Sequence, residues 1–184
     1  MAKLRDDRSN ATSPNQVWAM EWMYDELFNR KRIRVLTAVD TWSRICPIMY
    51  VTRSAIAQTV IEALQRARGD FGLLHTIRVD QGCRFTSKKF DLLAYSNSIT
   101  LDFSRPGKPT DNAFVESFNA SVRLESLGQN WFWDTEDAVQ KMEEWRRECN
   151  EVRPRSEIAD RPPINLMQKP MHGADGYQQA EILT

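Results

Sequence analysis

The stretch from residue 77 to residue 125 constrains the fold of this chain more than any other part of its sequence. It opens with a short apolar run that ends at Asp80, and Gly82 follows, as is typical of a strand that leads into a tight turn. It closes with a turn over residues 109–112 and an amphipathic helix that carries Glu116 in its second turn. A chain that joins strand ends to helices in this way folds as packed layers of helix and sheet.

Hydrophobic periodicity predicts the remaining elements. Runs rich in strand formers predict strands over residues 17–24, 34–39, 45–51, 76–79 and 99–103, and short polar connections make the first three an antiparallel meander. Apolar residues at helical spacing predict helices over residues 54–69, 87–95, 111–127 and 134–149. The expected caps and ends are Ser54, Ser87, Asp134 or Thr135, Gly69 and Gly128.

These elements predict a single α/β domain built on a five-stranded mixed sheet flanked by helices. The length of 184 residues, with 41% hydrophobic and 27% charged residues, suits one globular domain with ragged ends. Residues 1–14 are expected to be a polar linker, residues 15–165 the core, and residues 166–184 a C-terminal tail. Residues 104–111, which hold two prolines and a glycine, are expected to be among the least ordered internal segments.

Composition excludes several classes of site. The formal net charge is +0, which argues weakly against nonspecific adhesion to nucleic acid. Three cysteines without CxxC spacing and two isolated histidines make a disulfide scaffold or a zinc site improbable. The sequence contains neither an apolar run long enough to span a membrane nor a signal peptide. We therefore expect a reduced, cytoplasmic protein without a membrane partner.

Asp80 and Glu116 are the strongest candidates for chemistry, and 35 residues separate them. Alone, Asp80 would be an ordinary turn acid and Glu116 an ordinary helix-surface residue. Together, a strand-end acid and a helix acid are a recurrent way to hold divalent cations for phosphoryl transfer, because hard cations prefer oxygen ligands.

The ordered motifs resemble those of DDE transposases and retroviral integrases, and most of all the integrase core of a bacterial insertion-sequence transposase. The run from Asp80 to Phe85 matches the family's Asp-x-Gly-x-x-Phe pattern, and the spacing to Glu116 matches its Asp–Glu separation. The resemblance implies a ribonuclease-H-like fold and DNA strand transfer with two Mg²⁺ or Mn²⁺ ions. It also implies a cytoplasmic protein that works at the bacterial nucleoid.

The first acid of the resemblance falls on Glu21, shortly after Trp18, where the family has an aspartate. The longer side chain moves the carboxylate by roughly an ångström, which can cost on the order of 100-fold in rate. Asp25 and Asp40 are neighbouring acids, and we expect Asp40 to terminate a strand. Glu21, Asp80 and Glu116 are therefore the expected catalytic and metal-binding set. We expect their side chains to converge within metal-bridging distance and at least one of their pKa values to be raised.

Partners follow from the same resemblance. The expected DNA contacts are Lys108, Asn112, Asn119, Arg123, Arg153 and Arg155. After the last helix the family reads Tyr-Asn-x-x-Arg-Pro-His, whereas this chain has Cys149 for the tyrosine and Arg155 for the histidine. A homodimer or higher oligomer is expected, with an interface drawn from the first helix or from the aromatic residues Trp131, Phe132, Trp133 and Trp145.

Two other functions stay open at this point. A catalytically impaired core that serves only as a dimerisation or regulatory module is favoured by Glu21 and Arg155. A ribonuclease-H-type nuclease is the third reading, although the spacing of the acids and the long loop before Glu116 favour an integrase.

Overall fold

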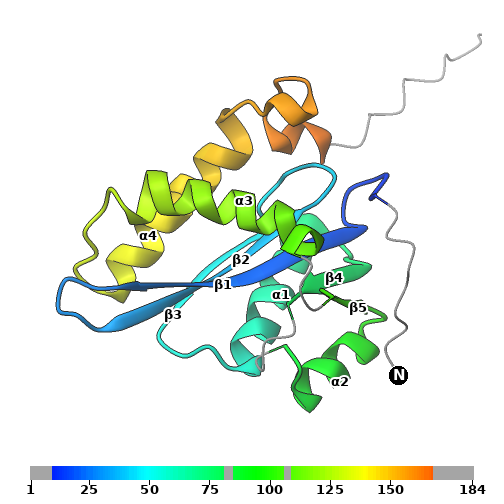
Figure 1. Cartoon of the computed structure of the whole chain (residues 1–184), viewed down its shortest axis with the longest axis horizontal. Helices are drawn as coiled ribbons and strands as arrows, with labels where there is room; N and C mark the ends of the chain where they lie inside the picture. Colours follow the sequence, from blue (N-terminus) through cyan, green and yellow to red (C-terminus); the bar gives the residue numbers. More distant parts are fainter. Residues whose placement is uncertain (1–9, 81–84, 106–108, 168–184) are drawn as a thin grey trace, which may run out of the picture.

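The computed structural model describes residues 10–80, 85–105 and 109–167, and its core is a five-stranded sheet with helices on both faces (Figure 1). The strands are β1 (Val17–Glu26), β2 (Arg32–Asp40), β3 (Ile48–Thr52), β4 (Thr76–Val79) and β5 (Thr100–Phe103). The helices are α1 (Ala57–Phe71), α2 (Lys88–Ser96), α3 (Ala113–Val122) and α4 (Thr135–Arg147). The predicted five-stranded α/β architecture is confirmed.

β1 is the central strand, in the sheet order β3-β2-β1-β4-β5. It pairs antiparallel with β2 and parallel with β4, and β4 pairs parallel with β5. The meander predicted for the first three strands is therefore correct, and the two later strands join it on its β1 side. A strand in this position is covered on both faces, which explains why β1 is bulky and apolar on both.

Alternate residues of β1 enter two separate cores. Trp18, Met20 and Trp22 pack with α1 and α2 on one face of the sheet. Met23 packs with α3 and α4 on the other face, together with Phe118 and Val122 of α3. The α3 face is the one that matters for function, because Glu21 belongs to the same set of alternating side chains as Met23.

α1 begins and ends later than its sequence indicated. Its N-cap is Ile56, which has no side-chain capping bond, whereas the carbonyl of Ser54 accepts the hydroxyl groups of Thr52 and Thr59. At the other end the helix continues through Gly69 and stops at Gly72, whose φ of 94° lies in the left-handed region. Glycine is permitted inside a helix at some cost, so a glycine alone did not fix the end.

α3 and α4 each pass into a π-helical turn, over Arg123–Leu127 and Glu148–Val152. Gly128 ends the first with a right-handed φ of −74°, and a side chain there would meet the carbonyl oxygen of Arg123 at 2.8 Å. Asp134 caps α4, as predicted, by accepting from the amide of Asp137. The second π-turn keeps Cys149 buried on the line of Met142 and Trp145.

The loop before α3 is described only in part. Residues 106–108 lie outside the described residues, so the expectation about order over residues 104–111 is not tested there. On either side, Arg105 and Asp111 form a two-bonded ion pair, with N–O distances of 3.0 Å each. Among the described residues no helix is long and apolar enough to cross a membrane.

Candidate active site

The pairing of β1 with β4 brings together the two segments that carry Glu21 and Asp80. The paired residues Val17 and Thr76, and each pair after them, are 59 positions apart. The pairing ends at Ala19 and Arg78, and Glu21 and Asp80 lie two residues beyond this pair on their two segments, where the charge of Asp80 acts on Glu21. Because Val79 enters the core under α1, the side chain of Asp80 belongs to the opposite face, which is the face of Glu21 and α3.

α3 crosses this face and holds Glu21 through Asn119. The Nδ2 of Asn119 donates to Oε2 of Glu21 at 2.8 Å, and its Oδ1 accepts the hydroxyl of Thr37 at 2.8 Å. Thr37 lies directly opposite Glu21 in the β1–β2 pair. Glu116 is exposed one helical turn before Asn119, on the same side of α3.

The pKa of Glu21 is raised above its ordinary value. Burial is the main cause, the hydrogen bond from Asn119 opposes it, and the charges of Glu116 and Asp80 raise the pKa further. Arg123 acts in the opposite direction. The charges of two further carboxylates and one guanidinium therefore act on the carboxylate of Glu21, and the expectation of a raised pKa at one of the acids is met at Glu21.

The three acids do not form a finished metal-binding cluster. In the described part of the chain, no group of three or more His, Cys, Asp or Glu side chains is arranged to hold a metal ion. The chemistry of the donors fits, since carboxylate oxygens are what Mg²⁺ and Mn²⁺ prefer. The convergence of the three side chains to metal-bridging distance therefore stays a prediction, although the charges of Glu116 and Asp80 do act on Glu21.

The neighbouring acids have structural roles. Asp40 is fully buried, and its carboxylate accepts the amides of Asn15, Trp42 and Ser43 and the Ser43 hydroxyl. It therefore terminates β2 and shapes the following turn, as expected. Asp25 lies four residues beyond Glu21 on β1 and accepts the amide of Glu26.

Phe85 is the first described residue after Asp80. It is buried, and its ring lies 5.8 Å from the ring of Phe90. Residues 81–84, which connect Asp80 to Phe85, lie outside the described residues.

The predicted DNA contacts fall into different environments. Arg123 is exposed and close enough to Glu21 to act on its charge, whereas Lys108 lies outside the described residues. Asn112 and Asn119 are only 5% exposed, and Oδ1 of Asn112 has no hydrogen-bond partner among the described residues.

The two arginines that follow α4 are held by their own chain. Arg153 pairs with Glu125 and Glu148, and its guanidinium stacks on Trp145, so its charge is already neutralised within the fold. Arg155 is half-buried. Its backbone pairs with that of Arg161 in an isolated bridge.

Thr37 and the positioning role of Asn119 were not anticipated from the sequence. The available signal was a hydroxyl residue inside the apolar run of β2 and an amide one turn after the helix acid. A buried polar group needs a partner, but the pattern alone does not say which one.

Comparison with known families settles what this arrangement belongs to. A model described as the integrase core domain matches residues 11–109, and a second integrase core domain model matches residues 97–163. The chain belongs to the integrase core family. An uncharacterized 31.7 kDa protein of insertion element IS407 from Burkholderia multivorans is 36% identical over 163 residues, which cover 89% of this chain and 59% of that protein.

Further integrase-core relatives come from other insertion elements. A 39.2 kDa protein of IS476 from Xanthomonas euvesicatoria is 34% identical over 85% of this chain and 45% of its own length. The transposase of IS904 from Lactococcus lactis is 25% identical over 72% of this chain and 53% of its own length. The chain thus spans about half the length of the curated relatives that it matches.

Solved structures agree on the fold. An integrase chain in the simian T-cell lymphotropic virus intasome, solved with a PP2A regulatory subunit, superposes with a TM-score of 0.76 at 17% identity and covers 98% of this chain and 63% of its own. The HTLV-2 integrase catalytic core in complex with magnesium superposes with a TM-score of 0.68 at 15% identity, over 85% of this chain and 99% of its own. These likenesses show that the fold is ribonuclease-H-like, as expected.

Proposed function

We propose that this chain is the catalytic core of an insertion-element transposase, and that it breaks and joins DNA phosphodiester bonds with Glu21, Asp80 and Glu116 as its three acids. One observation carries the proposal. Asn119 of α3, one turn after Glu116, donates to Glu21 at 2.8 Å, and the charges of Glu116 and Asp80 both act on the carboxylate of Glu21. In this proposal β1, the residue that follows β4, and α3 would each supply one carboxylate to the same site.

We expect these three acids to hold two divalent cations, either Mg²⁺ or Mn²⁺. Such ions would activate the attacking oxygen and stabilise the leaving oxygen. The part played by this chain is positioning. Asn119 holds Oε2 of Glu21, and Thr37 in turn holds Asn119, so the longer side chain at the first acid is fixed in one orientation. Glu116 and Asp80 complete the set from α3 and from the end of β4.

Contacts with DNA would come from the rim of this face. Arg123 is the best-placed phosphate ligand, because it is exposed and beside the acids. Lys108 and Asn112, from the segment that enters α3, are proposed as further contacts, and Arg155 as a more distant one. Such contacts position DNA without reading its sequence. We expect the reaction to take place in the cytoplasm, at the nucleoid.

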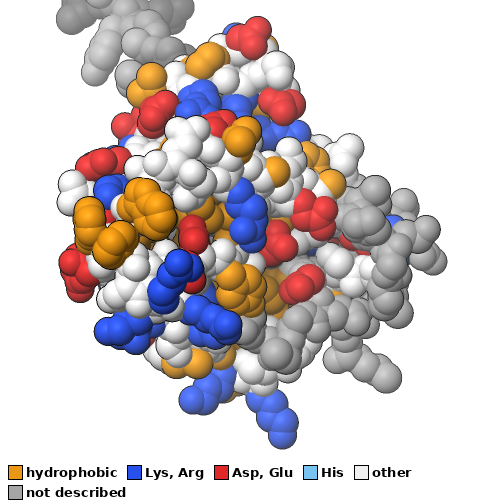
Figure 2. Space-filling view, turned by 60° about the vertical axis from the view of Figure 1, so that its left-hand side comes forward, with side chains coloured by type: hydrophobic (Ala, Val, Ile, Leu, Met, Phe, Trp, Pro, Cys, Tyr) orange, Lys and Arg blue, Asp and Glu red, His pale blue; other side chains and the backbone are white. Residues whose placement is uncertain are grey.

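Self-association is part of the same proposal. Phe28, Trp131 and Trp133 form an exposed aromatic patch, with Phe28 packed 4.8 Å from the ring of Trp133 and 5.9 Å from that of Trp131. Figure 2, in which the end of the molecule with the β1–β2 hairpin comes forward, shows hydrophobic side chains gathered in the open there. Phe132 and Trp145 are buried in the core of this chain, so they are not available for the interface in which we expected them.

A noncatalytic dimerisation module is the second candidate. Glu21 in place of the family aspartate favours it, as does the lack of a close three-acid cluster among the described residues. A ribonuclease-H-type nuclease is supported less well, since both matching family models describe integrase cores.

The deciding experiment is a strand-transfer assay with DNA that carries the ends of the element encoding this chain, in Mg²⁺ and in Mn²⁺. The native chain is expected to join strands, and Asp80→Asn or Glu116→Gln to abolish joining. Glu21→Asp is expected to raise the rate, by up to about 100-fold, if the extra methylene misplaces the carboxylate. Joining by neither the native chain nor Glu21→Asp would leave the noncatalytic module as the function.

A further inference from the structure

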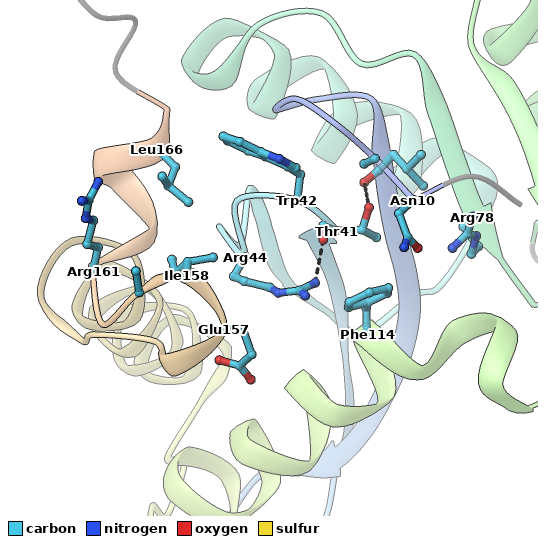
Figure 3. A pocket seen from close by; sticks show the side chains of 13 residues that line it. Asn10, Thr41, Trp42, Arg44, Arg78, Phe114, Glu157, Ile158, Arg161 and Leu166 are labelled. Carbon is cyan, nitrogen blue, oxygen red and sulfur yellow. Dashed lines mark hydrogen bonds between the residues drawn. The ribbon is translucent and has the colours of Figure 1, made fainter.

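A cavity of about 550 Å³ opens between the turn after β2, the first turn of α3 and the C-terminal segment, and it is not used by the chemistry proposed above (Figure 3). One wall is the turn after β2, with Trp42 and Arg44, and another is Phe114 in the first turn of α3. Ile158 and Leu166 close the side formed by the C-terminal segment. The volume is that of a small-molecule site, and the lining combines aromatic and aliphatic surface with several charged side chains.

Arg44 is one of three arginines that line this cavity, with Arg78 and Arg161, and Glu157 lines it as well. The guanidinium of Arg44 lies 4.2 Å from the centre of the Phe114 ring, and its Nη1 donates to the carbonyl of Thr41 at 2.6 Å. Within the described residues this is its one side-chain hydrogen bond, and no carboxylate lies within ion-pair distance. Burial lowers the pKa of Arg44, while the charges of Glu157 and Asp40 oppose that shift. A half-buried guanidinium with spare donors is suited to a phosphate group.

The turn that carries Arg44 is built to hold it in place. Arg44 has a φ of 65°, in the left-handed region that a residue with a side chain seldom adopts. The buried carboxylate of Asp40 binds the amides of Trp42 and Ser43, and the carbonyl of Asp40 accepts the amide of Arg44. The strained residue is therefore fixed by its surroundings, and its side chain is aimed at Phe114 (Figure 3).

The cavity approaches the acids along β4. Arg78, which lines the cavity, lies two residues before Asp80 and therefore on the same side of the sheet, whereas Phe114 and Glu116 project from different sides of α3. Two residues of strand span roughly 6.6 Å, which is within reach of the next nucleotide of a strand held at the acids. Arg78 is itself neutralised by Asp102 at 2.8 Å, so Arg44 and Arg161 are the lining cations that remain for a ligand, and Arg44 is the one packed against Phe114.

We propose that this cavity binds one unpaired nucleotide of the DNA strand next to the reacting phosphate, with the phosphate on Arg44 and the base against the indole of Trp42. Aromatic surface next to a cation is how unpaired nucleotides are held without sequence preference. The proposal rests on the transposase function and adds a second DNA site to it. It requires the strand to be single-stranded for at least one nucleotide beside the acids.

The test measures binding without divalent metal, by fluorescence anisotropy, so that the acids contribute no metal-dependent affinity. The probes are a duplex with a short single-stranded extension and the same duplex with abasic sites in the extension. The native chain should prefer the extension with bases by about 5- to 150-fold, the range for one stacked base. Trp42→Ala should lose that preference and Trp42→Phe should keep it.

Arg44 has its own readout. Arg44→Ala should weaken binding of both probes and reduce the slope of log affinity against log salt by about 0.7, the loss of one phosphate contact, whereas Arg44→Lys should keep the slope. Lys89→Ala on α2, which removes an exposed charge on the other face of the sheet, should leave the base preference unchanged.

Equal binding of the two probes by the native chain would overturn the proposal. The proposal would also be overturned if Trp42→Ala, folded with a native-like melting transition, still bound the extension with bases more tightly than the abasic extension. A native chain that joins strands without any base preference would overturn the cavity site and leave the transposase function intact. A native chain that binds neither probe and joins no strands would rule out both the cavity site and the transposase function.

Discussion

At the scale of single residues, Glu21 is held by a hydrogen bond from Asn119, but its carboxylate is partly buried near two other acids. It accepts from Asn119, yet burial and two neighbouring acids raise its pKa above 4.5. Between pH 4.5 and the raised value, the folded chain binds more protons than the unfolded chain, so the free energy of unfolding falls as pH rises through that window. The carboxylate at the centre of the site therefore costs stability at neutral pH.

Replacing Glu21 by glutamine should remove that cost, because the amide oxygen can still accept from Asn119. We expect Glu21→Gln to match the native stability near pH 4 and to exceed it increasingly toward neutral pH. Denaturant midpoints measured across this pH range test the prediction, with Glu62→Gln on α1 as the control. A variant that is less stable than the native chain at neutral pH would contradict it.

Asp40 offers the opposite case, an acid that stabilises the fold. An amide in its place can accept through only one oxygen, so Asp40→Asn should leave one of its backbone donors unsatisfied and cost about 1–3 kcal/mol. Chemical denaturation measures this loss. Any stabilisation by Mn²⁺ should be unchanged in the variant. Its disappearance in a folded Asp40→Asn protein would make Asp40 a metal ligand instead of a turn residue.

At the scale of elements, α1 begins without a capping side chain. Ile56 at its N-cap is 54% exposed, and its φ of −114° and ψ of 163° are already those of a cap residue. Ile56→Asp should therefore stabilise the protein by about 0.5–2 kcal/mol, because a carboxylate there can accept an orphan amide of the first turn. Ile56→Ala, which gains no cap, is the control in a thermal melt. Equal melting temperatures for the two variants would show that the cap does not form.

At the scale of the whole molecule, the acids are expected to couple metal binding to stability. Mn²⁺ should raise the melting temperature of the native chain, because a ligand that binds only the folded state stabilises it by mass action. Glu116→Gln removes a repelling charge and a ligand together. It should be as stable as the native chain without metal, or slightly more so, and should show no rise with Mn²⁺. If neither the native chain nor Glu21→Asp responds to Mn²⁺, the three acids are not a metal site.

Assembly is the second property of the whole molecule. If the aromatic patch of Phe28, Trp131 and Trp133 forms the interface, Trp131→Ser combined with Trp133→Ser should shift the chain from dimer to monomer in sedimentation velocity. Tyr95→Ser, which removes an aromatic ring that is 85% exposed on α2, should not. A native chain that sediments as a monomer at high concentration, or equal dissociation by the Tyr95 variant, would exclude this interface.

Local patterns determined much of this protein from sequence alone. Runs rich in strand formers predicted the five strands that the structure describes, and helical spacing predicted α1 to α4, because these signals depend on neighbours that are close in the sequence. The spacing from Asp80 to Glu116 indicated the family for the same reason, since it lies within one continuous stretch of chain. The ends of α1 were less certain, because several local capping options were nearly equal there.

Only the tertiary structure decided what the polar side chains do. Asn119 and Arg153 both looked like surface residues that could face DNA, yet one holds Glu21 and the other neutralises Glu125 and Glu148. The packing of distant segments decided that the charges of Asp80 and Glu116 act on Glu21, and the turn fixed by Asp40 decided that Arg44 faces Phe114. Each of these outcomes depends on contacts between segments far apart in the chain. A buried polar group must find a partner, and the fold, not its sequence neighbours, determines which partner is near.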